Sequence, residues 1–141
     1  MINYVCKYAP VELFKGFGQE CAVLEEMPEN FDKSDKIAHA NLCGFGKSVI
    51  QAVLEGKVEE LVLVNCCDSM RRVYDIIENT KKCKFLYMLD LPHEDNECEN
   101  IKFAQSILRL KKAYERYSHR TFDRAVSYTH LRAHETELHL V

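Results

Sequence analysis

The chain has 141 residues, of which 47% are hydrophobic and 29% are charged, and its formal net charge is −3. These values are typical of one soluble domain and indicate no electrostatic surface for nucleic acid or an anionic membrane. Because no apolar run approaches the ~20 residues of a membrane span and the N-terminus lacks a signal-peptide pattern, we expect a cytoplasmic protein.

The predicted elements alternate between strands and helices along the chain. Strands are predicted at residues 2–6, 21–25, 61–64 and 85–91. Helices are predicted at residues 11–17, at 43–54, after a cap at Asp68 or Ser69, and at 101–117. Residues 27–36 are polar and predict a surface connection, and residues 93–99 form an acidic loop.

The alternation predicts an α/β fold with Rossmann-like or flavodoxin-like layers and a mostly parallel sheet, here truncated. Residues 61–64 (LVLV) form a continuous apolar run, which is typical of a strand buried on both faces. We expect this strand to lie beside or close to the strand at 85–91. Sites in such folds collect at the carboxyl ends of the strands.

The chain contains seven cysteines, at positions 6, 21, 43, 66, 67, 83 and 98. In a reducing compartment, such a number more often indicates metal binding or catalysis than disulfides. Cys6 lies at or just past the end of the first predicted strand, Cys66 and Cys67 follow the third, and Cys43 opens a predicted helix, whose N-terminus favours a thiolate. Thiolates are the ligands that iron–sulfur clusters require. The spacing alone leaves two interpretations open, a metal site and buried structural cysteines.

Three segments are similar to the conserved blocks of a known family, in the same order. They are YVCKYAPVELF at 4–14, NLCGFGKS at 41–48 and VNCCDSMRRVYD at 64–75, and FLYMLDLP at 85–92 is similar to the strand that follows. On these blocks the chain resembles subunits of the 2-hydroxyacyl-CoA dehydratase/benzoyl-CoA reductase family. Lys7, Gly44 and Cys66 depart from the usual Ser, Pro and Ser of that family.

The resemblance implies a subunit that binds one [4Fe-4S] cluster through three cysteines. Cys43 and Cys67 match two of these positions, and the third ligand is either Cys6 or a cysteine outside this sequence. The implied reaction is the elimination of water from a 2-hydroxyacyl-CoA to an enoyl-CoA through a ketyl radical. The implied partners are a second dehydratase subunit in a heterodimer, an ATP-dependent iron–sulfur activator and the acyl-CoA substrate.

The resemblance also implies roles for three polar residues. Glu12 is expected to act in proton transfer or cluster ligation, and Arg71 and Arg72 are expected to bind CoA phosphates or cluster sulfurs, with a solvated pair as the alternative. Two other functions stay open: a benzoyl-CoA reductase-type subunit and a non-catalytic iron–sulfur or metal-binding relative. The substrate, and whether this is the catalytic or the partner subunit, are not determined by the sequence.

Residues 126–141 differ from the rest of the chain and continue no helical or strand period. The stretch VSYTHLRAHET is also the translation of a transposase adapter used in sequencing libraries. We therefore interpret residues 126–141 as an artefactual tail and residues 1–125 as a fragment of an α/β domain, whose gene is expected to continue further.

Overall fold

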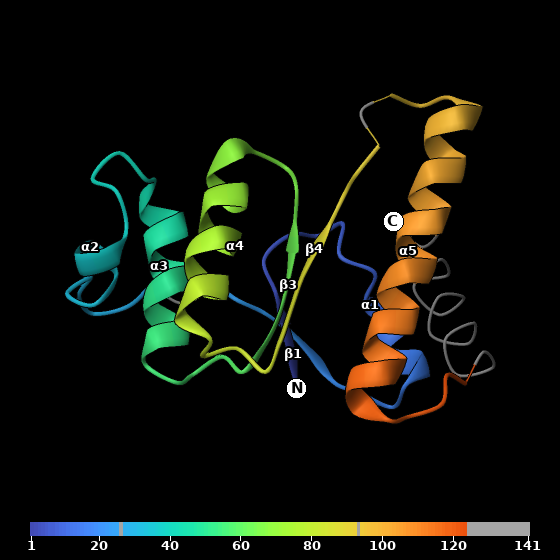
Figure 1. Cartoon of the computed structure of the whole chain (residues 1–141), viewed down its shortest axis with the longest axis horizontal. Coiled ribbons are helices and arrows are strands. Elements are labelled where there is room, and N and C mark those ends of the chain that lie inside the picture. The colour runs from blue at the N-terminus through green and yellow to red at the C-terminus, as the bar shows by residue number, and fades with distance from the viewer. Residues whose placement is uncertain (26, 93, 124–141) are drawn as a thin grey trace, which may run out of the picture.

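The computed structural model describes residues 1–25, 27–92 and 94–123 (Figure 1). Its strands are β1 (Ile2–Tyr4), β2 (Cys21–Val23), β3 (Glu60–Val64) and β4 (Phe85–Leu89). Its helices are α1 (Val11–Gly16), α2 (Ser34–Ile37), α3 (Gly44–Leu54), α4 (Asp68–Thr80) and α5 (Glu97–Ser118). The four strands form one parallel sheet in the order β2-β1-β3-β4, so the predicted α/β class is confirmed.

Helices cover both faces of the sheet, with α3 and α4 on one face and α1 and α5 on the other (Figure 1). Successive residues of β3 point to opposite faces. Leu61 and Leu63 pack with α3 and α4, whereas Val62 packs with α1 and α5. All three side chains are fully buried, which explains why β3 consists of an uninterrupted apolar run.

The strand order places a topological switch point between β1 and β3. The helix after β1 crosses to one face of the sheet and the helix after β3 crosses to the other. Because these two connections run to opposite faces, a crevice opens at the carboxyl ends of the two strands, and such folds bind their ligands there. Strands β3 and β4 are direct neighbours, with Val64 opposite Leu89, which confirms their predicted adjacency.

Strands β1, β2 and β4 each end two residues before the predicted end, and two helices also differ from the prediction. The short helix α2 forms inside the expected connection, because Gln51 of α3 accepts a hydrogen bond from the backbone N–H of Ser34 at 2.9 Å. Helix α5 begins at Glu97 rather than at residue 101, because the side chain of Asn96 caps it by accepting from the N–H of Glu99 at 2.8 Å.

The predicted cap of α4 was also wrong. Cys67 is the N-cap and Asp68 is the first helical residue, and the side chain of Cys67 makes no capping hydrogen bond. No helix in the part of the chain described here is long and apolar enough to cross a membrane. The interpreted tail at 126–141 and the boundary at residue 125 lie outside the described residues.

Candidate functional site

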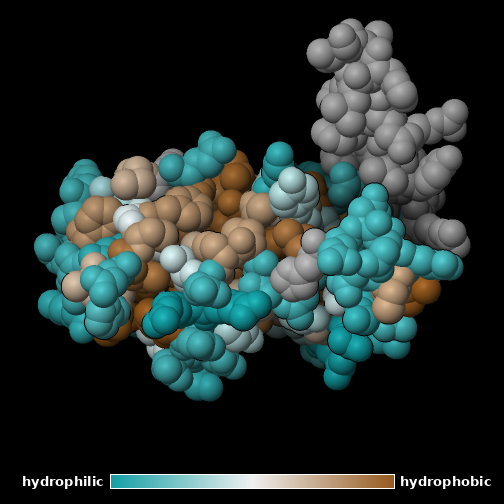
Figure 2. Space-filling model, turned by 90° about the horizontal axis from the view of Figure 1, so that it is seen from above, coloured by the Kyte–Doolittle hydropathy of each residue, from teal (hydrophilic) through white to brown (hydrophobic). Residues whose placement is uncertain are grey.

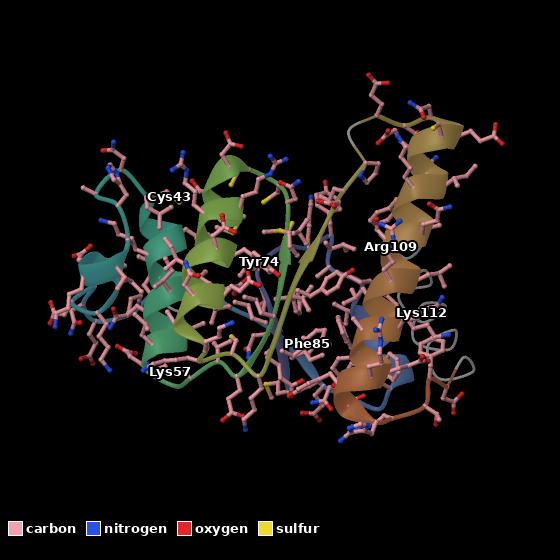
Figure 3. All side chains as sticks on the ribbon, viewed as in Figure 1. Cys43, Lys57, Tyr74, Phe85, Arg109 and Lys112 are labelled. Atoms are coloured by element: carbon pink, nitrogen blue, oxygen red, sulfur yellow. The ribbon has the colours of Figure 1, made fainter. Side chains whose placement is uncertain are left out.

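Cys43 forms the N-cap of α3. Its backbone is extended, and its Sγ accepts a hydrogen bond from the N–H of Gly46 at 3.3 Å. The sulfur thus takes the position that a serine or aspartate oxygen takes in an ordinary cap. A Cβ on Gly46 would stand only 3.1 Å from Val73 of α4, so the two helices approach each other closely beside this thiol (Figure 3).

Cys67 forms the N-cap of α4, and its side chain makes no capping bond. It is exposed, as Cys43 is. The chain turns sharply before it, because the N–H of Cys66 donates to the carbonyl of Val64 at 2.8 Å. Cys43 and Cys67 therefore begin adjacent helices on the same face of the sheet, and both helices start at its carboxyl edge (Figure 1).

Cys66 lies near two other thiols at the end of β3. Partial burial raises the pKa of the Cys66 thiol, and the neighbouring thiols of Cys67 and Cys6 raise it further. Cys6 reaches this position because it follows β1, which pairs directly with β3. The switch point between β1 and β3 therefore carries three cysteines.

A cavity of ≈540 Å³ lies between the starts of α3 and α4. Asn41 and Leu42, just before Cys43, line one side, and Asp68 and Ser69, just after Cys67, line the other. The remaining lining residues are His39, Arg72, Asp75 and Ile76. Seen from this edge, hydrophobic residues gather over the middle of the molecule and hydrophilic residues border them (Figure 2).

The sequence did not single out His39, although it borders this cavity. Its Nδ1 accepts a hydrogen bond from the N–H of Asn41 at 3.1 Å, which fixes the orientation of the ring. The only local signal was its position four residues before Cys43. The cavity itself depends on how α3 packs against α4, which a single sequence does not reveal.

The family model of the 2-hydroxyglutaryl-CoA dehydratase D-component matches residues 6–129. The chain belongs to this family. The match includes the segments at 41–48 and 64–75 in full and the first segment from Cys6 onward, and it confirms a 2-hydroxyacyl-CoA dehydratase-type subunit. The comparison with curated proteins gives no match.

The donor chemistry of this dehydratase-family chain fits an iron–sulfur cluster. All seven cysteines are free, and Cys43 and Cys67 offer exposed thiols at helix N-termini, where the dipole favours an anionic ligand. A complete ligand set is not assembled, however. Across residues 1–25, 27–92 and 94–123, no group of three His, Cys, Asp or Glu side chains is placed to hold a metal ion.

Glu12 lies away from Cys43 and Cys67. It is half-buried in the first turn of α1, which packs on the same face of the sheet as α5. The two cysteines begin helices on the opposite face. The structure therefore does not place Glu12 on the face that carries these two predicted ligands, and its role stays a prediction.

Arg71 and Arg72 face different cavities. Arg72 lines the cavity between α3 and α4, whereas Arg71 lines a second one between the strand ends and α5. Consecutive helical residues point about 100° apart, so the two side chains diverge. They are therefore not placed to act on one ligand group, although each remains a candidate for its own cavity.

Proposed function

We propose that this chain is the part of a 2-hydroxyacyl-CoA dehydratase subunit that holds a [4Fe-4S] cluster, with Cys43 and Cys67 as two of its ligands. One observation carries the proposal: both cysteines are N-caps of adjacent helices, and the residues beside them line a single ≈540 Å³ cavity. Membership of the dehydratase D-component family supports it independently.

The two helix starts supply what a negatively charged cluster needs. Backbone N–H groups at a helix N-terminus donate hydrogen bonds to sulfur and offset its negative charge. The N–H of Gly46 already donates to Cys43, and the first N–H groups of α4 have no side-chain cap at Cys67. Arg72 of the cavity wall adds a positive charge.

The third ligand is either Cys6 or a cysteine outside this sequence. Cys6 lies close enough to affect the pKa of Cys66, which is next to Cys67. The lining of the cavity between α3 and α4 contains none of Cys6, Cys43, Cys66 and Cys67 themselves, only the residues next to Cys43 and Cys67. Both alternatives for the third ligand therefore stay open.

When bound, the cluster would supply a low-potential electron to the thioester carbonyl of the acyl-CoA. The expected reaction removes water from a 2-hydroxyacyl-CoA and gives an enoyl-CoA. Cys43 and Cys67 would supply two of the sulfur ligands, and the hydrophobic residues that gather over the middle of this side of the molecule would limit access of water (Figure 2). A second subunit and an ATP-dependent activator are the proposed partners.

Anaerobic reconstitution with iron and sulfide tests the proposal. Cys43→Ser and Cys67→Ser each keep a group that can cap a helix but remove the thiolate, so cluster absorbance and the EPR signal of the reduced cluster should be lost. Cys98→Ser is the matched control, because Cys98 is exposed in the first turn of α5. A normal cluster in both test variants would refute the ligand assignment.

A further inference from the structure

A second cavity, of ≈510 Å³, opens on the other face of the sheet at the ends of β3 and β4. Strand-end residues and the N-terminal half of α5 form its walls. The lining residues are Asn65, Arg71, Asp90, Leu91, Pro92, Glu99, Lys102, Phe103, Gln105, Ser106 and Arg109. Three of them are cationic, and they come from two helices that are far apart in the sequence.

Arg71 is held in place by a chain of polar contacts. Its Nε donates to Oδ1 of Asn65 at 2.7 Å, and Nδ2 of Asn65 donates to Oδ1 of Asp90 at 3.2 Å. Asn65 directly follows β3 and Asp90 directly follows β4. The residues that follow two neighbouring strands therefore orient the guanidinium group of Arg71. Within the described part of the chain, the terminal NH2 groups of this guanidinium make no ion pair.

Arg109 faces the same cavity from α5 (Figure 3). It is exposed and has no hydrogen bond or ion pair with any residue that the structure describes. Its side chain reaches toward the sheet: burial raises the pKa of Tyr87 on β4, and the positive charge of Arg109 opposes that rise. A second guanidinium is thus available at the mouth of the cavity.

The two carboxylates in the lining do not neutralise both arginines. Glu99 accepts an ion pair from Lys102 at 3.3 Å, and Asp90 accepts the hydrogen bond of Asn65. The lining therefore contains Arg71, Lys102 and Arg109 against two carboxylates. A planar guanidinium group can bind two oxygens of one phosphate at once, so two arginines in the lining of one cavity make a fitting receptor for a phosphate group.

We propose that this cavity binds a phosphate or diphosphate group through Arg71 and Arg109. The location agrees with the preference of parallel α/β sheets for ligands at the carboxyl ends of strands. Two sources could supply the group: the diphosphate of coenzyme A, an assignment that rests on the proposed function, or free inorganic pyrophosphate. The shared chemistry is a phosphate oxyanion between two guanidinium groups.

Calorimetric titration of the full 141-residue chain without iron tests the site, with coenzyme A and inorganic pyrophosphate as separate probes. Arg109→Gln should weaken both probes by about tenfold or more, because charge-assisted hydrogen bonds are lost. Lys112→Gln makes the same charge change one turn further along α5, outside the lining, and should leave both affinities unchanged.

Equal affinities in the Arg109→Gln and Lys112→Gln variants, or no binding of either probe to the unaltered chain, would overturn the proposal. Tighter binding of coenzyme A than of pyrophosphate assigns the site to the coenzyme, and equal affinity assigns it to a free oxyanion. Because the titration needs no iron, its outcome is separate from that of cluster reconstitution. A chain that binds the cluster but neither probe would refute the phosphate site alone.

Discussion

The side chain of Gln51 in α3 binds the backbone at the start of α2. Replacing Gln51 tests whether these hydrogen bonds stabilise the segment that precedes Cys43. Its side chain is 1% exposed. Its Oε1 accepts from the backbone N–H groups of Ser34 at 2.9 Å and Lys33 at 3.1 Å. Gln51→Met keeps the volume of the side chain but removes both acceptors.

The cost follows from the two donors. The N–H of Ser34 is buried, so leaving it unpaired costs about 1–3 kcal/mol, and the N–H of Lys33 is only partly buried, so its loss costs about 1 kcal/mol. Urea unfolding should therefore show a loss of roughly 2–4 kcal/mol. In Gln51→Met, the backbone amides of Lys33 and Ser34 should also exchange hydrogen faster than in the unaltered chain, and this increase should be larger than at the amides of the rest of the core.

The same substitution at exposed Gln105 is the control and should change stability by less than about 0.5 kcal/mol. Gln51 also donates to Glu55 at 2.8 Å, and this hydrogen bond is the largest cause of the lowered pKa of that carboxyl. The pKa of Glu55 should therefore rise in Gln51→Met. Equal stability losses in the two variants, with unchanged exchange at Ser34, would refute the anchoring role of Gln51.

Three further results are expected. Tyr114 packs edge-on against Phe14 and Phe85, with ring centroids 5.3 Å apart in each pair. Tyr114→Ala should therefore lower the free energy of unfolding by about 3–5 kcal/mol, and a loss below about 1 kcal/mol would contradict this packing of α5. Burial raises the pKa of Cys83 from its ordinary value of 9.0 to about 11. Because the folded state holds this proton more tightly, the contribution of Cys83 to stability should be constant below pH 9.0 and fall as the pH approaches about 11. Cys83→Ala should make the decline in stability smaller without removing it, because burial also raises the pKa of Cys21 to about 11 and that of Tyr114 to about 12; an identical decline in the variant would contradict the cause. In the iron-free chain at neutral pH, iodoacetamide should modify exposed Cys98 well before Cys83, as mass spectrometry can show, and equal rates would contradict the burial of Cys83.

The parts of the fold that the sequence predicted are those with local signals. The apolar run at 61–64 indicated a buried parallel strand, and α3 ends at Leu54 as predicted, shortly before Gly56, whose φ of 77° is typical of a residue that follows a helix. The short helix α2 was missed because it depends on Gln51, which is 17 residues from Ser34. The start of α5 was missed although the Asn96 cap is a local signal that could have been used.

In the candidate site, too, only the features with a local sequence signal could be predicted. The position of Cys43 and Cys67 before helices could be predicted, since each precedes an amphipathic segment. Which residues surround them could not be predicted, because the cavity is made by the packing of α3 on α4. The divergence of Arg71 and Arg72 follows from helical geometry, but the existence of a separate cavity for each depends on the tertiary structure.

Residue-by-residue thiol protection decides the ligand assignment. The chain is reconstituted anaerobically with iron and sulfide, treated briefly with iodoacetamide, and analysed by mass spectrometry beside an iron-free sample. We predict that Cys43 and Cys67, both exposed in the free chain, become protected, while exposed Cys98 reacts equally in both samples. A sample that contains a cluster but in which Cys43 and Cys67 react as fully as Cys98 would contradict the assignment.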